Sequence, residues 1–338
     1  MKKFNDVSGE QAMLPGMPKP SAYEIRKADE ITAIAARIED ERERRLWTDA
    51  LACARDVALA CLPRSRTDEK TVTKEIQYAP GCKVKVKYSV PDDSEMPFGS
   101  DRFVLFGIQH LAREQDDPVV TFETAGQLLD MFDLSKDGRE YRLLRERFER
   151  LRSLSIEIET TGMAVEGGAG RIGLGARLIE KWHLPNGSGE KARAGKMPFF
   201  VTLSDSVFSR LQKGSDDENI LLLRLDLLKL FVRNPRGWDF AAFLCHRCGS
   251  AQRTSVVPHD FLMQFFKNGS TEPDRVTIAA LRKIHKQIMA ATGGALKSEF
   301  IEVGKDRSGP GRPRKIWGLQ ARPSRAVIIG GKGRFKEV

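Results

Sequence analysis

The sequence has few of the residues from which catalytic centres, metal sites and disulfide scaffolds are usually built. Its 338 residues include five histidines, four tyrosines and five cysteines. An odd number of cysteines at no framework spacing favours reduced thiols. No stretch approaches the roughly 20 consecutive apolar residues of a membrane span. Residues 1–6 lead into no apolar run, so we expect no signal peptide and a cytoplasmic protein.

The sequence can be checked for the motifs of three kinds of catalytic or metal-binding site. Gly195-Lys196 resembles part of a phosphate loop, but Glu190 stands where such a loop needs glycine, and Met197 where it needs Ser or Thr. No two histidines are spaced as the metal pair of a nicking enzyme. Cys245-His246-Arg247-Cys248 lacks the second pair of ligands that structural zinc requires, even if His259 is added. We therefore predict no enzyme, no cofactor and no metal.

The positive charge is concentrated near the C-terminal end of the sequence. The formal net charge is +10 and the sequence pI is about 9.4. Residues 304–338 contain ten basic and two acidic residues, and so hold eight of the ten net charges. This distribution favours a polyanionic partner. A merely solubilising tail is the alternative for the last fifteen residues.

One order of elements points to a DNA reader. Residues 96–161 give three helical patterns and then an alternating strand. In the third helix, 138–154, the residues Tyr141, Leu144, Phe148 and Leu151 share one face at 100° per residue. Three arginines lie opposite, and the Gly-rich tip 167–171 follows the strand. Helix, helix, basic helix, strand and wing tip is the order of a winged helix, so we predict DNA contacts by Arg139, Arg142, Arg150 and Arg171. A solvated, salt-bridged face is the alternative, because Glu140, Glu146 and Glu149 are interleaved.

The same order appears again toward the C-terminus. Helices are expected at 238–245, 258–266 and 273–292, followed by strands at 300–303 and 316–319. The third helix has no acidic residue after Asp274 and presents Arg275, Arg282, Lys283 and Lys286. The loop 304–315 contributes Lys305, Arg307, Arg312, Arg314 and Lys315. Its Gly-Arg-Pro core suggests either a minor-groove hook or plain phosphate contacts.

The N-terminal part is expected to form helices and a hairpin. Ser21 and Glu24 suggest a capped helix from Ala22 with Ile31, Ile34 and Ile38 as its apolar stripe. A second helix is expected at 47–62, and a hairpin at 71–88 turning at Pro80-Gly81. The helical pair could mediate self-association; the plainer interpretation is that it packs on the first winged helix.

Together these patterns predict an α+β fold with two tandem winged helices, preceded by a helical segment and a hairpin. The expected parts are a flexible arm (1–20), the N-terminal helices and hairpin (21–90), winged-helix domain 1 (91–213), winged-helix domain 2 (214–320) and a basic tail (321–338).

Three stretches carry a resemblance to a known family. MPFGSDRFVLFGIQHLAR (96–113), TAGQLLDMFDL (124–134) and GREYRLLRERFERL (138–151) resemble the RepA-type plasmid replication initiators. The resemblance extends loosely through residue 320 and leaves out residues 1–90 and about the last twenty. It implies a bacterial protein in which two winged helices bind double-stranded DNA at repeated origin sequences (iterons). It also implies origin opening with the host replication initiator and helicase machinery, and a role in plasmid copy control. A transcriptional regulator or autorepressor with the same tandem fold is the rival; a nuclease or primase would need clustered carboxylates, and none is visible.

Overall fold

The computed structural model describes most of the chain outside the ends and several loops. The described residues are 21–44, 50–79, 82–122, 124, 126–165, 168–183, 199–212, 220–249, 251, 253–267, 271–306 and 314–324. The flexible arm and the tail beyond residue 324 therefore lie outside the described residues. None of the helices described is long and apolar enough to cross a membrane.

A winged helix is formed by the middle of the chain. Its elements are α3 (Asp101–Gln115), β4 (Val119–Phe122), α4 (Gly126–Met131), α5 (Gly138–Arg152), β7 (Ile179–His183) and β8 (Phe199–Leu203). The strand order is β4-β8-β7, so the strand between the first two helices pairs with the last strand. Helix α5 is the third helix and occupies the place of a recognition helix.

The C-terminal part repeats this topology. Its elements are α8 (Pro235–Gly249), β10 (Ser255–Val257), α9 (His259–Lys267), α10 (Asp274–Ala291), β11 (Ser298–Asp306) and β12 (Arg314–Ala321). The strand order β10-β12-β11 matches that of the first unit element for element. The predicted fold class, α+β with tandem winged helices, is confirmed.

The first wing is not the hairpin that the sequence suggested. Strands β5 (Ser155–Val165) and β6 (Gly168–Arg177) do form a hairpin, but they extend the expected hairpin of β2 (Thr71–Ala79) and β3 (Cys82–Ser89). The result is a separate four-stranded sheet of order β2-β3-β5-β6, whose strand β2 also contacts α9. Because β7 and β8 complete the winged-helix sheet, they form the first wing. The prediction that the strand after helix 138–154 and the Gly-rich tip 167–171 form this wing was wrong.

The N-terminal segment is helical only in part. Helix α1 (Ala22–Arg44) begins at the predicted capping box, in which the Ser21 amide donates to Glu24 Oε2 (2.8 Å) and the Glu24 amide to Ser21 Oγ (3.2 Å). The single helix expected at 47–62 was wrong. That stretch contains strand β1 (Ala50–Ala54) and the short helix α2 (Arg55–Ala60).

Strand β1 is fixed by a distant partner. It pairs antiparallel with β9 (Ile220–Arg224), which leads into α7 (Leu225–Lys229) and then α8. The other short helix, α6 (Asp205–Phe208), follows β8. Residues 213–219, where the sequence placed the boundary between the two winged helices, lie outside the described residues. The predicted domain limits stay predictions.

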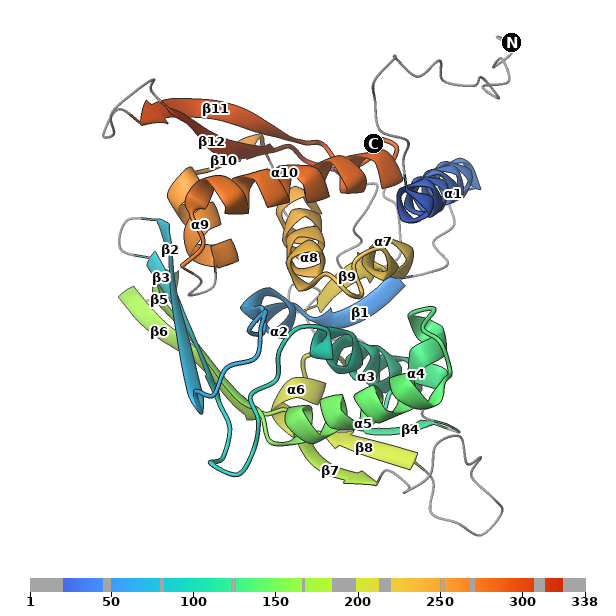
Figure 1. Cartoon of the computed structure of the whole chain (residues 1–338). Helices are drawn as coiled ribbons and strands as arrows, with labels where there is room; N and C mark the ends of the chain where they lie inside the picture. The colour runs from blue at the N-terminus through green and yellow to red at the C-terminus, as the bar shows by residue number, and fades with distance from the viewer. Residues whose placement is uncertain are drawn as a thin grey trace.

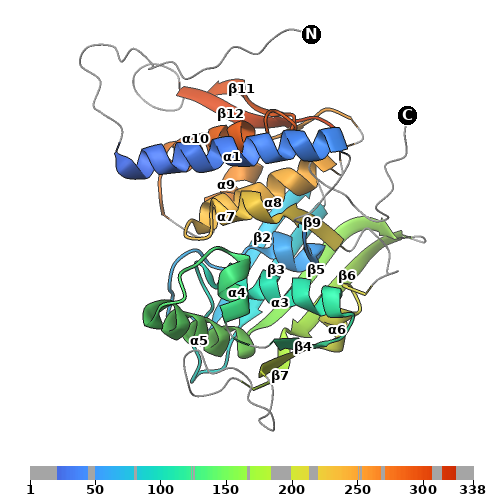
Figure 2. The same cartoon turned by 90° about the vertical axis from the view of Figure 1, so that its right-hand side faces the viewer.

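Helix α1 packs on the recognition helix of the second unit. Ile34 and Ile38 are buried, as the apolar stripe predicted, and α1 contacts α10. Figure 1 views α1 nearly end-on beside α10, and Figure 2 shows it lengthwise in front of α10. The plainer interpretation, packing on the first winged helix, is therefore wrong for α1, but the other half of the segment does pack there, since β1 contacts α3 and the Ala54 amide donates to Gln109 Oε1 at 3.0 Å.

The two winged helices meet through their first helices. In Figure 1, α10 and its wing lie at the top, α5 and β7–β8 at the bottom, and α3 and α8 between them. Trp238 of α8 lies 5.6 Å, centroid to centroid, from both Phe106 of α3 and Phe132 after α4. All three rings are buried. Aromatic packing of this kind joins the two units through one apolar core.

A buried ion pair crosses the same junction. Arg102 of α3 donates from Nε to Asp239 Oδ1 (2.6 Å) and from Nη2 to Oδ2 (2.8 Å) on α8. The two side chains are only 2% and 6% exposed. Nη1 of the same guanidinium donates to the carbonyl oxygens of Gly99 (2.6 Å) and Pro63 (3.3 Å). With its donors satisfied, this arginine holds both winged helices and the segment before β2 together.

Candidate nucleic-acid interface

Helix α5 begins with an N-cap, Asp137. The Asp137 carboxylate accepts a hydrogen bond from the Glu140 amide (2.8 Å), which lowers the pKa of Asp137. Leu144, Phe148 and Leu151 are buried, as the wheel predicted. The opposite side of α5 is therefore fixed toward solvent, where DNA could reach it.

The exposed side of α5 carries charges of both signs. Arg139, Arg142 and Arg145 are exposed there, and Arg142 approaches Glu146 at 4.0 Å. Glu149 pairs with Arg152 at 2.6 Å. Arg145 was missed in the sequence analysis, although the wheel places it on the same arc as Arg142. A face with partly compensated charge suits selective contacts better than strong phosphate attraction.

Arg150 does not lie on that face, and its predicted base contact does not fit the structure. Its guanidinium makes a two-pronged pair with Asp101 of α3, Nε to Oδ2 at 2.7 Å and Nη2 to Oδ1 at 2.8 Å. It also covers the ring of Phe98 at 4.9 Å, and its side chain is only 12% exposed. A carboxylate at the start of α3 thus draws Arg150 inward and makes it a structural residue.

The prediction for Arg171 is affected by the reassignment of the first wing. Arg171 lies on β6, opposite Thr161 of β5, and so belongs to the four-stranded sheet and not to the wing. The side chain of Arg171 lies outside the described residues. The loop 184–198 between β7 and β8 lies outside them as well.

Helix α10 presents a face of one sign. Ile278, Leu281, Ile284 and Ile288 are buried, as predicted. The exposed cationic side chains are Arg275, Arg282, Lys283 and Lys286. No acidic residue occurs in α10 after Asp274, whose carboxylate pairs with Lys267 (2.8 Å) and lies 3.5 Å from His259. Because nothing on this face repels phosphate, α10 is the stronger electrostatic candidate, although α5 carried the clearer sequence signal.

Trp317 links α10 to its wing. The guanidinium carbon of Arg282 lies 4.1 Å from the centre of the indole ring, and Lys315 Nζ lies 5.7 Å from it. Lys315 also pairs with Glu302 of β11 at 2.7 Å, which lowers the pKa of Glu302. No local pattern marks Trp317 for this role, because the role depends on how β12 lies against α10. Stacking on an indole restricts the arginine and so pre-organises its donors.

A groove runs between α10 and the wing. It has a volume of about 780 Å³ and is lined by Arg275, Ala279, Arg282, Lys315 and Trp317, with Asp260 and Asp274 at its α9 end. Apolar and aromatic side chains share the lining with three cations, which outnumber the two carboxylates. Such a groove suits the sugar-phosphate backbone of a duplex in whose major groove the helix lies.

The remaining predicted residues of the second wing are only partly described. Lys305 of β11 and Lys315 of β12 are exposed, and Arg314 begins β12. Arg307 and Arg312 lie in the tip outside the described residues. Their DNA contacts stay predictions.

The cysteines on α8 are buried in the described structure. Burial raises the pKa of Cys245, and that of Cys248 to about 11, so both thiols are held in the protonated form. Among the residues described, no group of three or more His, Cys, Asp or Glu side chains could hold a metal ion.

No protein-family model and no curated protein matches the sequence. Among solved structures, the chain is similar to a crystal structure of RctB domains 2–3 (RctB-155-483), with a TM-score of 0.48 and 13% identity. That match covers 80% of this chain and 97% of the other. A second crystal structure, of selenomethionine derivatives of RctB domains 2 and 3, matches with a TM-score of 0.47 and 11% identity, covering 78% and 95%.

Proposed function

We propose that this protein binds double-stranded DNA with both winged helices and initiates plasmid replication at an origin that carries repeated binding sites. The observation that carries the proposal is the junction between the two units. Trp238 and the Arg102–Asp239 pair join α3 to α8 through a buried core. Two DNA readers joined in this way act as one rigid body, which fits a long site with fixed internal spacing.

In this proposal, α10 contributes mainly to the affinity for DNA and α5 mainly to the selectivity between DNA sequences. The all-cationic face of α10, with its wing, supplies much of the affinity, because each neutralised phosphate releases counterions. The mixed face of α5 supplies selectivity through Arg139 and Arg142. If both helices enter the major groove on one side of B-DNA, their half-sites lie about one helical turn apart, roughly 10 bp.

Origin opening is the further step of the proposal. The resemblance of 96–151 to plasmid initiators supports it, and a host initiator and helicase are the expected partners. The protein acts by binding and distorting DNA, without catalysis of its own. Origin binding should therefore be equal in EDTA and in magnesium; a magnesium-dependent nick by the pure protein would contradict this point.

Selection of binding sites from random duplexes tests the DNA-binding part. We expect one site with two half-sites at constant spacing, and inserting 5 bp between them, about half a helical turn, should abolish high-affinity binding. Arg275→Ala should weaken binding. Arg26→Ala, on an α1 side chain that is 77% exposed and pairs with Glu30, is the matched control. Equal affinity for duplexes with and without the insertion would contradict a rigid protein with two DNA-binding units.

A plasmid assay separates the initiator from its rival. A replicon carrying the selected repeats should be maintained only where the protein is supplied, and should be lost with Arg275→Ala. If the protein represses a promoter that carries the repeats but never supports replication, it is a transcriptional regulator. Whether it also self-associates through its N-terminal segment stays a prediction.

A further inference from the structure

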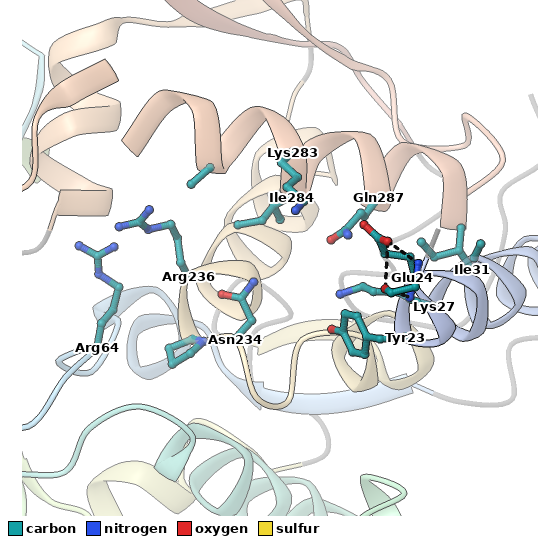
Figure 3. Close-up of a pocket in the computed structure, with 14 residues that line it drawn as sticks. Tyr23, Glu24, Lys27, Ile31, Arg64, Asn234, Arg236, Lys283, Ile284 and Gln287 are labelled. Atoms are coloured by element: carbon teal, nitrogen blue, oxygen red, sulfur yellow. Dashed lines mark hydrogen bonds between the residues drawn. The ribbon is translucent and has the colours of Figure 1, made fainter. Parts of the chain in front are cut away.

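A cavity lies on the flank of α10 that faces away from the wing. It is open to solvent, has a volume of about 810 Å³ and is lined by residues of α1, α10, the start of α8 and the segment before β2. Figure 3 shows Tyr23, Glu24, Lys27 and Ile31 on one side and Lys283, Ile284 and Gln287 above them. Arg64 and Arg236 lie at the other end of the same cavity.

Four of the five charged side chains in the lining are cations. Four segments that are far apart in the sequence each contribute one, namely Lys27, Arg64, Arg236 and Lys283. The one acidic lining residue, Glu24, is already engaged by Ser21, whose hydroxyl donates to Glu24 Oε2 at 2.9 Å. The hydrogen bonds from Ser21, and after them the charge of Lys283, lower the pKa of Glu24, so this carboxylate stays ionised and offsets one of the four cations.

The two arginines crowd one another. Burial, and next the nearby charge of Arg236, lower the pKa of Arg64 to about 10. Arg236 pairs with Glu272, and Arg64 donates to the carbonyl oxygen of Lys267, so their positions are fixed by the protein. Three guanidinium groups, those of Arg64, Arg236 and the buried Arg102, lie near two carboxylates, Glu272 and Asp239, which leaves one excess positive charge that a bound anion would relieve.

We propose that this cavity is a binding site for a phosphate group. A phosphate has tetrahedral oxygens that accept from several directions, and arginine is the side chain best matched to it. A carboxylate offers only two oxygens in one plane, so it can accept from fewer of these cations than a phosphate can. The site is separate from the groove beside Trp317, and only Lys283 belongs both to the cavity and to the exposed face of α10.

Two sources could supply this phosphate group. One is the backbone of DNA lying on α10, because Lys283 borders both surfaces. The other is a free phosphate compound, which would brace α1 against α10 and so act beside the recognition helix. The chemistry of the site is the same in both cases, and the experiment distinguishes them.

Calorimetric titration of the full chain with inorganic pyrophosphate at constant ionic strength tests the site. We expect one saturable site, weakened about tenfold by Lys27→Gln or Arg64→Gln, each of which removes a charge-assisted contact. Arg26→Gln is the matched control on the same helix, because Arg26 pairs with Glu30 and does not line the cavity. Thermal unfolding checks that the variants fold; if Arg64→Gln does not, the comparison of Lys27→Gln with Arg26→Gln decides alone.

Absence of saturable binding by the wild-type chain would overturn the proposal. Equal weakening by Arg26→Gln and Lys27→Gln would overturn it too, since it would indicate diffuse attraction. If pyrophosphate displaces DNA, and Lys27→Gln lowers the slope of log affinity against log salt by about one unit, the phosphate belongs to DNA. If the DNA complex still binds pyrophosphate, the ligand is a free compound. A chain that binds pyrophosphate but no DNA would refute the proposed function and leave this site standing.

Discussion

Asp101 and Arg102 are adjacent in the chain, and each is held in a different ion pair. Asp101 binds Arg150 of α5, the recognition helix of the first unit, whereas Arg102 binds Asp239 of α8, the first helix of the second. The start of α3 therefore connects the third helix of the first winged helix to the first helix of the second. The residues Gly99–Arg102, within the stretch that carries the family resemblance, serve this connection and do not contact DNA in the proposed arrangement.

Breaking the Arg102–Asp239 pair should destabilise the protein and loosen its spacing requirement. Asp239→Asn leaves the buried guanidinium without a countercharge, and we expect a loss of about 3 kcal/mol in the free energy of unfolding, measured in urea. Variant protein that still folds should tolerate a 5 bp insertion between half-sites better than the wild type. A loss below about 1 kcal/mol, with spacing still strict, would show that the aromatic contacts suffice.

Substitution of Arg150 should lower stability without changing base preference, and substitution of Arg139 should do the reverse. Arg150→Met leaves Asp101 buried without its main partner and should cost about 3 kcal/mol of stability while leaving the preferred DNA sequence unchanged. Arg139→Ala should leave the unfolding temperature unchanged and cost about 1–3 kcal/mol of discrimination at one base position. Unfolding curves and competition binding on specific and random duplexes measure both. A change of base preference in Arg150→Met would show that Arg150 does contact a base, as the sequence analysis predicts.

Trp317 and Arg282 should be energetically coupled in DNA binding. A double-mutant cycle with Trp317→Leu and Arg282→Ala should give a coupling energy of about 1 kcal/mol for the specific duplex. Trp317→Phe should retain part of it, because an aromatic face remains. Additive effects of the two substitutions would mean that the indole does not position the arginine.

The second wing should supply affinity with little selectivity. Replacing Lys305, Arg307, Arg312, Arg314 and Lys315 by alanine should lower the slope of log affinity against log salt by up to roughly four units, while the ranking of target sequences survives. Binding isotherms at several salt concentrations measure the slope. If Arg312→Ala alone removes a preference for A·T pairs without changing the slope, the tip reads the minor groove.

Lys74 should give stability a measurable pH dependence. It is buried, it donates to the carbonyl oxygen of Ala60 (3.3 Å), and burial lowers its pKa to about 8. A folded-state pKa below the unfolded one means that the unfolded chain binds more protons between pH 8 and about 10.4, so stability rises with pH across that window. The free energy of unfolding should increase there relative to Lys74→Met, by an amount of the order of 2 kcal/mol. Parallel pH profiles of the two proteins would show that Lys74 titrates normally.

Patterns within single elements were determined by the sequence alone. The capping box at Ser21, the apolar faces of α5 and α10 and the absence of acids from the outer face of α10 all depend on residues within a few turns of one another. Helical periodicity and capping are local properties, so these features, and with them the repeated helix order of two winged helices, could be predicted.

Pairings between distant segments were decided only by the tertiary structure. Alternation marks β5 as a strand, but pairing with β3 takes it out of the wing. Arg150 lies against the core because it pairs with Asp101, which is 49 residues earlier in the chain. Strand β1 is a strand because it pairs with β9. Helix α1 covers α10, from near the other end of the chain. Bringing such distant segments together costs chain entropy, and only the packing of the whole core offsets that cost. A short stretch of sequence therefore cannot predict these pairings.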